Sequence, residues 1–129
     1  LFRSAIYRPY LDKIGLTYPQ YLVIMVLWEY KTVTVKQLGE LLWLDSGTLT
    51  PLLKRMEANG FLIRKRSSED ERVVDIIITE KGEALEKEAE SIPPAMKKAL
   101  EIGDEELVTL REHLKKILNI TSKCNVKLL

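Results

Sequence analysis

The sequence has 129 residues, with 20 lysines and arginines against 19 aspartates and glutamates, so its net charge at pH 7 is +1. This length fits one domain, or a small domain with extensions. A hydrophobic content of 46% with 30% charged residues is ordinary for a globular chain and too apolar for a disordered one. The longest uncharged apolar run, residues 21–28, is far shorter than the ~20 residues that a transmembrane helix needs, so we expect no membrane association.

The counts of cysteine and histidine exclude several kinds of site. A single cysteine, Cys124, excludes an internal disulfide framework and an all-cysteine metal site. A single histidine, His113, excludes a site built from paired imidazoles of one chain. We therefore expect neither a metal nor a cofactor. No signal peptide is recognisable, so we expect a cytoplasmic protein, and a first residue Leu1 indicates further residues upstream.

Two segments begin with the spacing of a capping box, in which a threonine is followed three residues later by a glutamine. Thr17 and Gln20 precede the apolar run 21–28, and its length favours a buried helix over a buried strand. Thr34 and Gln37 precede a two-turn helix whose apolar face consists of Val35, Leu38, Leu41 and Leu42.

A third helix contains apolar residues at helical spacing (Leu49, Leu52, Leu53 and Met56) and ends at Asn59 and Gly60. Its outward face carries Gly47, Thr50, Pro51, Lys54, Arg55 and Ala58. Because proline is harmless only where its nitrogen needs no helical partner, either the regular helix begins near Thr48 or its first turn is distorted.

The periodicity then changes from about 3.6 to about 2. Residues 61–66 and 73–78 are β-rich runs around the charged loop 67–72, which predicts a hairpin. Residues 79–100 are expected to form a long helix that is broken or kinked at Pro93 and Pro94. Asp104 is expected to cap a last helix with an apolar stripe of Leu107, Leu110, Leu114, Ile117 and Leu118.

This order of elements predicts a mainly α protein with a small β-hairpin wing, a winged helix-turn-helix. Residues 32–79 would form the DNA-binding domain, and residues 1–31 and 80–129 would be helices of a dimerisation region. In such a fold the second helix enters the DNA major groove with its N-terminal residues leading. The stripe on the last helix suits packing within the chain or against a second chain. In a dimer, two reading helices would meet half-sites ~10 bp apart.

The predicted reading helix offers small groups and cations. Ser46, Gly47, Thr48 and Thr50 allow a close approach to base edges, while Lys54 and Arg55 can reach phosphates or guanine. Five cations and one acid between Lys54 and Arg66 leave a local charge of +4. Arg72 in the hairpin loop can enter the minor groove. Each feature taken separately also fits a solvated helix face, a helix cap or a simple turn, and only their order favours DNA binding.

The sequence resembles the MarR family of bacterial transcription regulators, and within it the organic-hydroperoxide-resistance repressors. The resemblance is carried by residues 16–22, by residues 44–57 with the string Leu-Asp-Ser-Gly-Thr-Leu-Thr-Pro, and by Asp70-Glu71-Arg72. It implies a dimer that binds a pseudo-palindromic operator. By this resemblance Ser46, Thr48, Lys54 and Arg55 would face the operator, with Arg72 in the wing and Asp70 orienting it. From the residue pattern we add five predicted contacts on the same surface: Gly47, Thr50, Pro51, Arg64 and Arg66.

The resemblance also implies a redox input. In the hydroperoxide sensors a reactive cysteine near the N-terminus is hydrogen-bonded by tyrosines that match Tyr7 and Tyr18, and its oxidation releases the operator. The matching position lies upstream of Leu1, outside this chain, and Cys124 matches neither that cysteine nor a relative's second cysteine.

Three other functions compete with a peroxide-released repressor. One is a repressor released by a small phenolic or carboxylate ligand in the cleft between the dimerisation and DNA-binding regions. Another is a winged-helix module that binds proteins and not DNA. An enzyme is the least expected, because the sequence has no nucleophile elbow, phosphate loop, paired acid motif or metal-ligand spacing.

Overall fold

The computed structural model describes the backbone of residues 2–123 and the side chains of residues 5–120. By packing, the chain forms two units, one up to Ile92 and one from Pro93 onward, which are described separately. In chain order the elements are α1 (Phe2–Ile14), α2 (Tyr18–Tyr30), β1 (Thr32–Thr34), α3 (Val35–Leu42), α4 (Ser46–Ala58), β2 (Leu62–Arg66), β3 (Val74–Ile78), α5 (Glu80–Ala89), α6 (Ile92–Ala99) and α7 (Asp104–Lys123).

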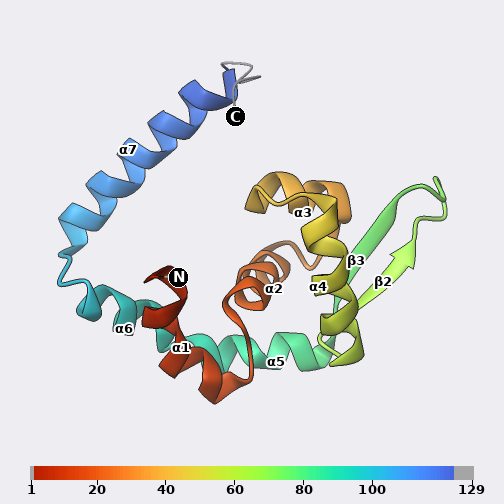
Figure 1. The fold of residues 1–129 in the computed structure, drawn as a ribbon, viewed down its shortest axis with the longest axis horizontal. Coiled ribbons are helices and arrows are strands. Elements are labelled where there is room, and N and C mark those ends of the chain that lie inside the picture. Colours follow the sequence, from red (N-terminus) through yellow and green to blue (C-terminus); the bar gives the residue numbers. More distant parts are fainter. Residues whose placement is uncertain (1, 124–129) are drawn as a thin grey trace. The chain divides into compact units, whose positions relative to one another are not determined.

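The first unit contains a three-stranded antiparallel sheet in the order β1-β3-β2. The hairpin of β2 and β3 confirms the predicted wing, and it extends beside α4 (Figure 1). Strand β1 was not predicted, because three residues are too few to show a two-residue period. It pairs with β3, where Val33 lies opposite Ile76, and both of these side chains are buried.

The core of this unit lies between the helices and one face of the sheet. Helix α2 is central, with Val23, Ile24 and Leu27 fully buried, as its apolar run predicts. Leucines and a methionine at the predicted spacing of α3 and α4 (Leu38, Leu49, Leu52, Leu53 and Met56) pack into the same core. At roughly 25 cal/mol per Å² of apolar surface removed from water, this burial is the main force that assembles the unit.

Both capping boxes are confirmed. Gln20 Oε1 accepts from the Thr17 nitrogen at 2.9 Å, and Thr17 Oγ1 accepts from the Gln20 nitrogen at 3.4 Å. The corresponding distances between Thr34 and Gln37 are 2.9 and 3.1 Å. These bonds satisfy N–H groups that have no partner inside a helix, and they fix where α2 and α3 begin.

Helix α4 begins at Ser46, so of the two alternatives for its start, the one that places it near Thr48 is wrong. Asp45 is its N-cap, and the carboxylate accepts a hydrogen bond from the Thr48 nitrogen at 2.8 Å. Pro51 therefore lies inside the helix, where its missing N–H leaves the Gly47 carbonyl without that helical bond. Gly47 is exposed, so water can hydrate this carbonyl, and the cap stabilises the turn.

The predicted break within residues 79–100 is confirmed, but it falls at Glu90 and Ser91, just before the prolines. Pro93 and Pro94 lie in the first turn of α6, where the missing N–H groups would have no helical partner. The prolines therefore start a helix here and do not kink one.

In the second unit, α7 begins at Asp104, which is therefore the first helical residue and not the cap that the sequence predicts. The helix is longer than its apolar stripe. Lys97 of α6 forms an ion pair with Asp104. The stripe side chains Leu110, Leu114, Ile117 and Leu118 are exposed in this single chain, and Leu107 is half-buried. Over the described residues, the helices are too short or too polar to traverse a bilayer.

Candidate nucleic-acid interface

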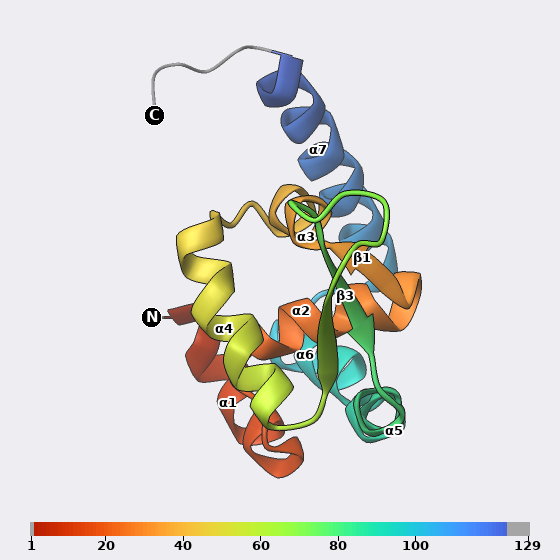
Figure 2. The same cartoon turned by 90° about the vertical axis from the view of Figure 1, so that its right-hand side faces the viewer.

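One face of α4 carries the side chains that are predicted from the sequence to contact DNA. Leu49, Leu52, Leu53 and Met56 are buried, so the helical period turns the other residues outward. Those outward residues are all exposed: Ser46, Gly47, Thr48, Thr50, Pro51, Lys54 and Arg55. The wing lies next to this helix, because β2 packs against α4 (Figure 2).

The N-terminus of α4 is preorganised by its cap. The hydrogen bond from the Thr48 nitrogen lowers the pKa of Asp45, so its carboxylate is charged at neutral pH. This charge fixes the first turn and leaves the exposed Ser46 and Thr48 side chains on the outside of the helix. Short hydroxyl side chains at this end let a helix approach a duplex closely.

In the wing loop Asp70 holds Arg72. One carboxylate oxygen accepts from the Arg72 nitrogen and from its Nε at 3.0 and 3.1 Å, and the other accepts from Nη2 at 3.1 Å. These bonds lower the pKa of Asp70 and raise the pKa of Arg72. The Arg72 side chain is nevertheless 90% exposed, so it is oriented and still accessible. Arg66 also braces the loop, since its Nη1 donates to the Glu71 carbonyl oxygen at 2.7 Å.

Arg64 has a different environment from the other predicted DNA contacts. Its Nε donates to Glu57 Oε2 at 2.8 Å, and its backbone nitrogen donates to Glu57 Oε1 at 2.9 Å. Both side chains are about one-third exposed. The pair joins the last turn of α4 to β2. The pKa of Glu57 is lowered, most by the bond from the Arg64 backbone nitrogen and next by the bond from the Arg64 side chain. Sequence reasoning counted Glu57 only as a charge, because no local pattern links a helix residue to a strand seven residues later.

A groove of about 790 Å³ lies between α3, α4 and the wing. Its walls include Val35, Leu49 and Val73, and Thr50, Arg64 and Arg72 also line it. It lies within the winged part of the first unit and not in the predicted cleft between the DNA-binding and dimerisation regions. Lys36 and Glu40 line it as well, and the two guanidinium groups are already paired with Glu57 and Asp70. The groove is therefore mainly apolar, with polar groups at its edge.

Tyr7 of α1 and Tyr18 of α2, the predicted redox pocket, are in contact, with ring centroids 5.1 Å apart. A third ring, Tyr21, lies 6.0 Å from Tyr7 and was assigned from sequence only to the helix core. Burial and then the neighbouring Tyr18 raise the pKa of Tyr7, and burial also raises that of Tyr21. Both phenols are therefore protonated at neutral pH and can donate hydrogen bonds to an anion.

The predicted site residues thus form two groups on different elements. The hydroxyls and cations lie on α4 and the wing, whereas the tyrosines lie on α1 and α2. Cys124 lies outside the described residues. Within the part of the chain that the structure describes, no three histidine, cysteine, aspartate or glutamate side chains gather to hold a metal ion.

The chain matches a known protein family and several known proteins. The family model "Transcriptional regulator SarA/Rot" matches residues 5–89, which include the tyrosine cluster, α4 and the wing. The chain belongs to this family of transcriptional regulators. It is also 49% identical to the organic hydroperoxide resistance transcriptional regulator of Bacillus subtilis over 92% of this chain and 81% of that protein. The resemblance seen in the sequence is therefore confirmed.

Two solved structures share the fold. Reduced AbfR of Staphylococcus epidermidis, bound to DNA, matches with a TM-score of 0.73 and 32% identity, over 93% of this chain and 83% of that one. A mutant of MarR from Escherichia coli, complexed with operator DNA, matches with a TM-score of 0.78 and 25% identity, over 89% and 84%. The mainly α winged fold is thus confirmed for this SarA/Rot-family chain.

Proposed function

We propose that this SarA/Rot-family chain is a dimeric repressor that binds a pseudo-palindromic DNA operator through α4 and the wing. The main support is the exposed hydroxyl and cation face of α4 beside an arginine that Asp70 orients toward solvent. The two solved relatives that carry DNA in their structures share this fold. The proposed role is binding and not catalysis, and it places the protein in the cytoplasm with the chromosome.

The exposed groups divide by the part of the duplex that they fit. Ser46, Thr48 and Thr50, with the close approach that Gly47 permits, face base edges in the major groove. Lys54 and Arg55 contact phosphates, and Arg72 enters the adjacent minor groove, where the negative potential favours a guanidinium. Pro51 and Arg66 line the same surface. Arg64 stabilises the wing through Glu57 and reaches DNA only if that pair opens.

The second unit supplies the dimer contact. Exposed leucines repeat along α7 at a spacing of three and four residues, which suits packing against a helix of a second chain. Residues 80–129, together with residues 1–31, form the dimerisation region in this proposal, and residues 32–79 form the reading domain. A two-fold dimer presents two copies of α4 to half-sites ~10 bp apart.

The proposed input is oxidation of a cysteine upstream of Leu1 by an organic hydroperoxide, as the name of the Bacillus subtilis relative suggests. The thiolate attacks the terminal oxygen of the hydroperoxide and the O–O bond breaks. The proton of the hydroperoxide passes to the leaving alkoxide, so the products are a sulfenate and an alcohol. Tyr7, whose phenol is protonated, and the neighbouring Tyr18 hydroxyl are suited to hold this thiolate. AbfR has been solved in reduced, disulfide and overoxidised forms.

A second candidate input is a small phenolic or carboxylate ligand, and the groove lined by Arg64 and Arg72 is the observation that favours it. Titrating operator complexes with cumene hydroperoxide or with salicylate separates the two inputs. Release by peroxide that disappears when the cysteines of the full-length protein are replaced by serine supports the thiol. Release by salicylate that survives this replacement supports the groove.

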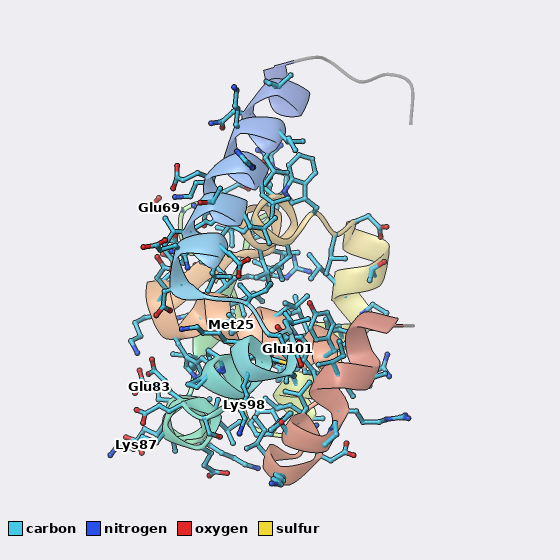
Figure 3. The ribbon with its side chains drawn as sticks, turned by 90° about the vertical axis from the view of Figure 1, so that its left-hand side faces the viewer. Met25, Glu69, Glu83, Lys87, Lys98 and Glu101 are labelled. Carbon is cyan, nitrogen blue, oxygen red and sulfur yellow. The ribbon has the colours of Figure 1, made fainter. Side chains whose placement is uncertain are left out.

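Arg72→Ala tests the proposed interface. Fluorescence anisotropy with an operator duplex should show binding weakened by about tenfold, because a desolvated guanidinium contact is lost. The control is Lys87→Ala, which removes the same charge from the outer side of α5 (Figure 3) and should change the affinity less than twofold. An Arg72→Ala affinity equal to that of the unchanged protein would remove the wing from the proposal. Affinity that is indifferent to salt would favour a module that binds protein.

A further inference from the structure

The first turn of α5 packs very closely against Phe61, in the segment that follows α4. Gly82 is buried there, and a Cβ atom on it would lie 2.3 Å from the Phe61 carbonyl oxygen and 2.9 Å from Ile78 Cγ1. Both distances are shorter than real Cβ contacts, so only glycine permits this approach. The start of α5 and the end of α4 are therefore held at one fixed separation.

Three hydrogen bonds reinforce this approach. The Thr79 hydroxyl donates to the Gly60 carbonyl oxygen at 2.6 Å, and the Thr79 nitrogen donates to the Phe61 carbonyl oxygen at 3.2 Å. Lys81 Nζ donates to the Asn59 carbonyl oxygen at 2.7 Å and lies 5.0 Å from the centroid of the Phe61 ring. The carbonyls of the three residues that follow α4 are thus all held by residues 79–81, so movement of this turn moves the end of α4.

Helix α2 is joined to the same turn by one side chain. The indole Nε1 of Trp28 donates to the Gly82 carbonyl oxygen at 2.9 Å, across 54 residues of sequence. An indole has only this one donor, so the bond fixes the direction of the ring. The ring also lies edge-on to Tyr21, at 6.2 Å between centroids, and Tyr21 contacts Tyr7. Contacts therefore run without a gap from the tyrosine cluster to the end of α4.

We propose that Trp28 is a positioning residue that couples the tyrosine cluster of α1 and α2 to the reading helix α4, through Gly82 and the first turn of α5. This inference rests on the proposed function, since it concerns how the operator-binding surface is regulated. Coupling between two sites is reciprocal: a change at the cluster alters operator affinity, and operator binding alters the surroundings of Trp28. A brace that only stabilises the fold would show neither effect.

The reciprocal effect can be measured without an oxidant. The sequence has two tryptophans, and Trp43→Phe removes the exposed one, leaving Trp28 as the only indole of these 129 residues. In this variant of the full-length protein, titration with an operator duplex should change Trp28 emission at the concentrations at which anisotropy reports binding. Binding by anisotropy with unchanged Trp28 emission would overturn the coupling. Absence of binding by anisotropy would overturn the proposed function, and this inference with it.

The effect of the tyrosine cluster on operator affinity is tested with Trp28→Phe. This substitution keeps a ring beside Tyr21 and removes the donor to the Gly82 carbonyl oxygen. We expect operator affinity of the reduced full-length protein to stay within about threefold, while the ratio of reduced to oxidised affinity falls at least about fivefold. Trp43→Phe is the matched control and should leave the ratio unchanged. An unchanged ratio in Trp28→Phe, with a lowered Tm, would show a structural brace and overturn the proposal. If Trp28→Phe does not fold, the emission experiment with Trp43→Phe still tests the coupling.

Discussion

At the scale of single residues, two acid–arginine pairs have different roles. Asp70 and Arg72 form an exposed pair, and because exposed pairs contribute little to stability, this one acts mainly by orienting the guanidinium. Glu57 and Arg64 are more shielded and also use the Arg64 backbone nitrogen, so they join α4 to the wing. The same residue type thus serves as a candidate DNA contact in one place and as a brace in another.

The brace predicts a pH-dependent stability. The folded pKa of Glu57 lies below its ordinary value of 4.5, so its contribution is fully present above pH 4.5 and is lost as the pH falls through the folded value. Glu57→Gln should lower Tm at pH 7, and the difference from the unchanged protein should shrink below pH 4.5. Scanning calorimetry across this range measures the effect, with substitution of the exposed Glu86 of α5, Glu86→Gln, as control. A difference that is the same at every pH would show that the carboxylate charge is irrelevant.

Lys54 and Thr48 lie on the same exposed face of α4 and should differ in what they read. Lys54→Ala is expected to weaken binding to all duplexes and to reduce the slope of log affinity against log salt by about one unit, as loss of one phosphate contact does.

Thr48→Ala should leave that slope unchanged and alter the preference among operator variants. Anisotropy over a series of salt concentrations measures both, and an unchanged slope in Lys54→Ala would place this lysine off the phosphates.

At the scale of elements, the position of α4 depends on its neighbours at both ends. Asp45 fixes its first turn, and the first turn of α5 fixes the residues that follow it. The reading helix is therefore presented as a rigid body, and its exposed face needs little ordering when it binds, which lowers the entropic cost of recognition.

Gly82→Ala tests the packing of α5 on the end of α4. A methyl group 2.3 Å from the Phe61 carbonyl oxygen forces the backbone apart, and such overpacking costs about 1–3 kcal/mol of unfolding free energy. Urea denaturation measures this change in the free energy of unfolding. Gly103→Ala is the matched control, since its added methyl meets only a Glu106 side-chain oxygen at 3.4 Å, and it should change stability by less than about 0.5 kcal/mol. Equal effects of the two substitutions would contradict the close approach.

At the scale of the whole molecule, the proposed dimer explains the exposed apolar stripe of α7. A side chain such as Leu114, half exposed in the single chain, gains roughly 25 cal/mol for each Å² that a second chain covers. Several such side chains on one face make a dimer the arrangement that removes this surface from water.

Leu114→Glu should therefore dissociate the dimer, because burying an unpaired carboxylate in an apolar interface is strongly unfavourable. Sedimentation velocity at micromolar concentration should show a dimer for the unchanged protein and monomer for this variant, with operator affinity reduced in parallel. Thr109→Glu introduces the same charge on the opposite side of α7 and should leave the dimer intact. A monomeric unchanged protein would contradict the proposed assembly.

The sequence is sufficient to predict the local features: both capping boxes, the apolar face of α4, the hairpin of the wing, and the exposed residues of the reading helix. The predicted apolar face of α3 is only partly buried, since Leu38 is buried and Leu41 is exposed. Each of the local features follows from residues within a few positions of one another, where capping, helical period and strand alternation act. The tertiary structure alone decided the features that join distant segments: the pairing of β1 with β3, Glu57 with Arg64, Tyr21 within the tyrosine cluster, and Trp28 on Gly82. These contacts depend on how the helices pack against the sheet, and the pattern of neighbouring residues carries no record of that packing.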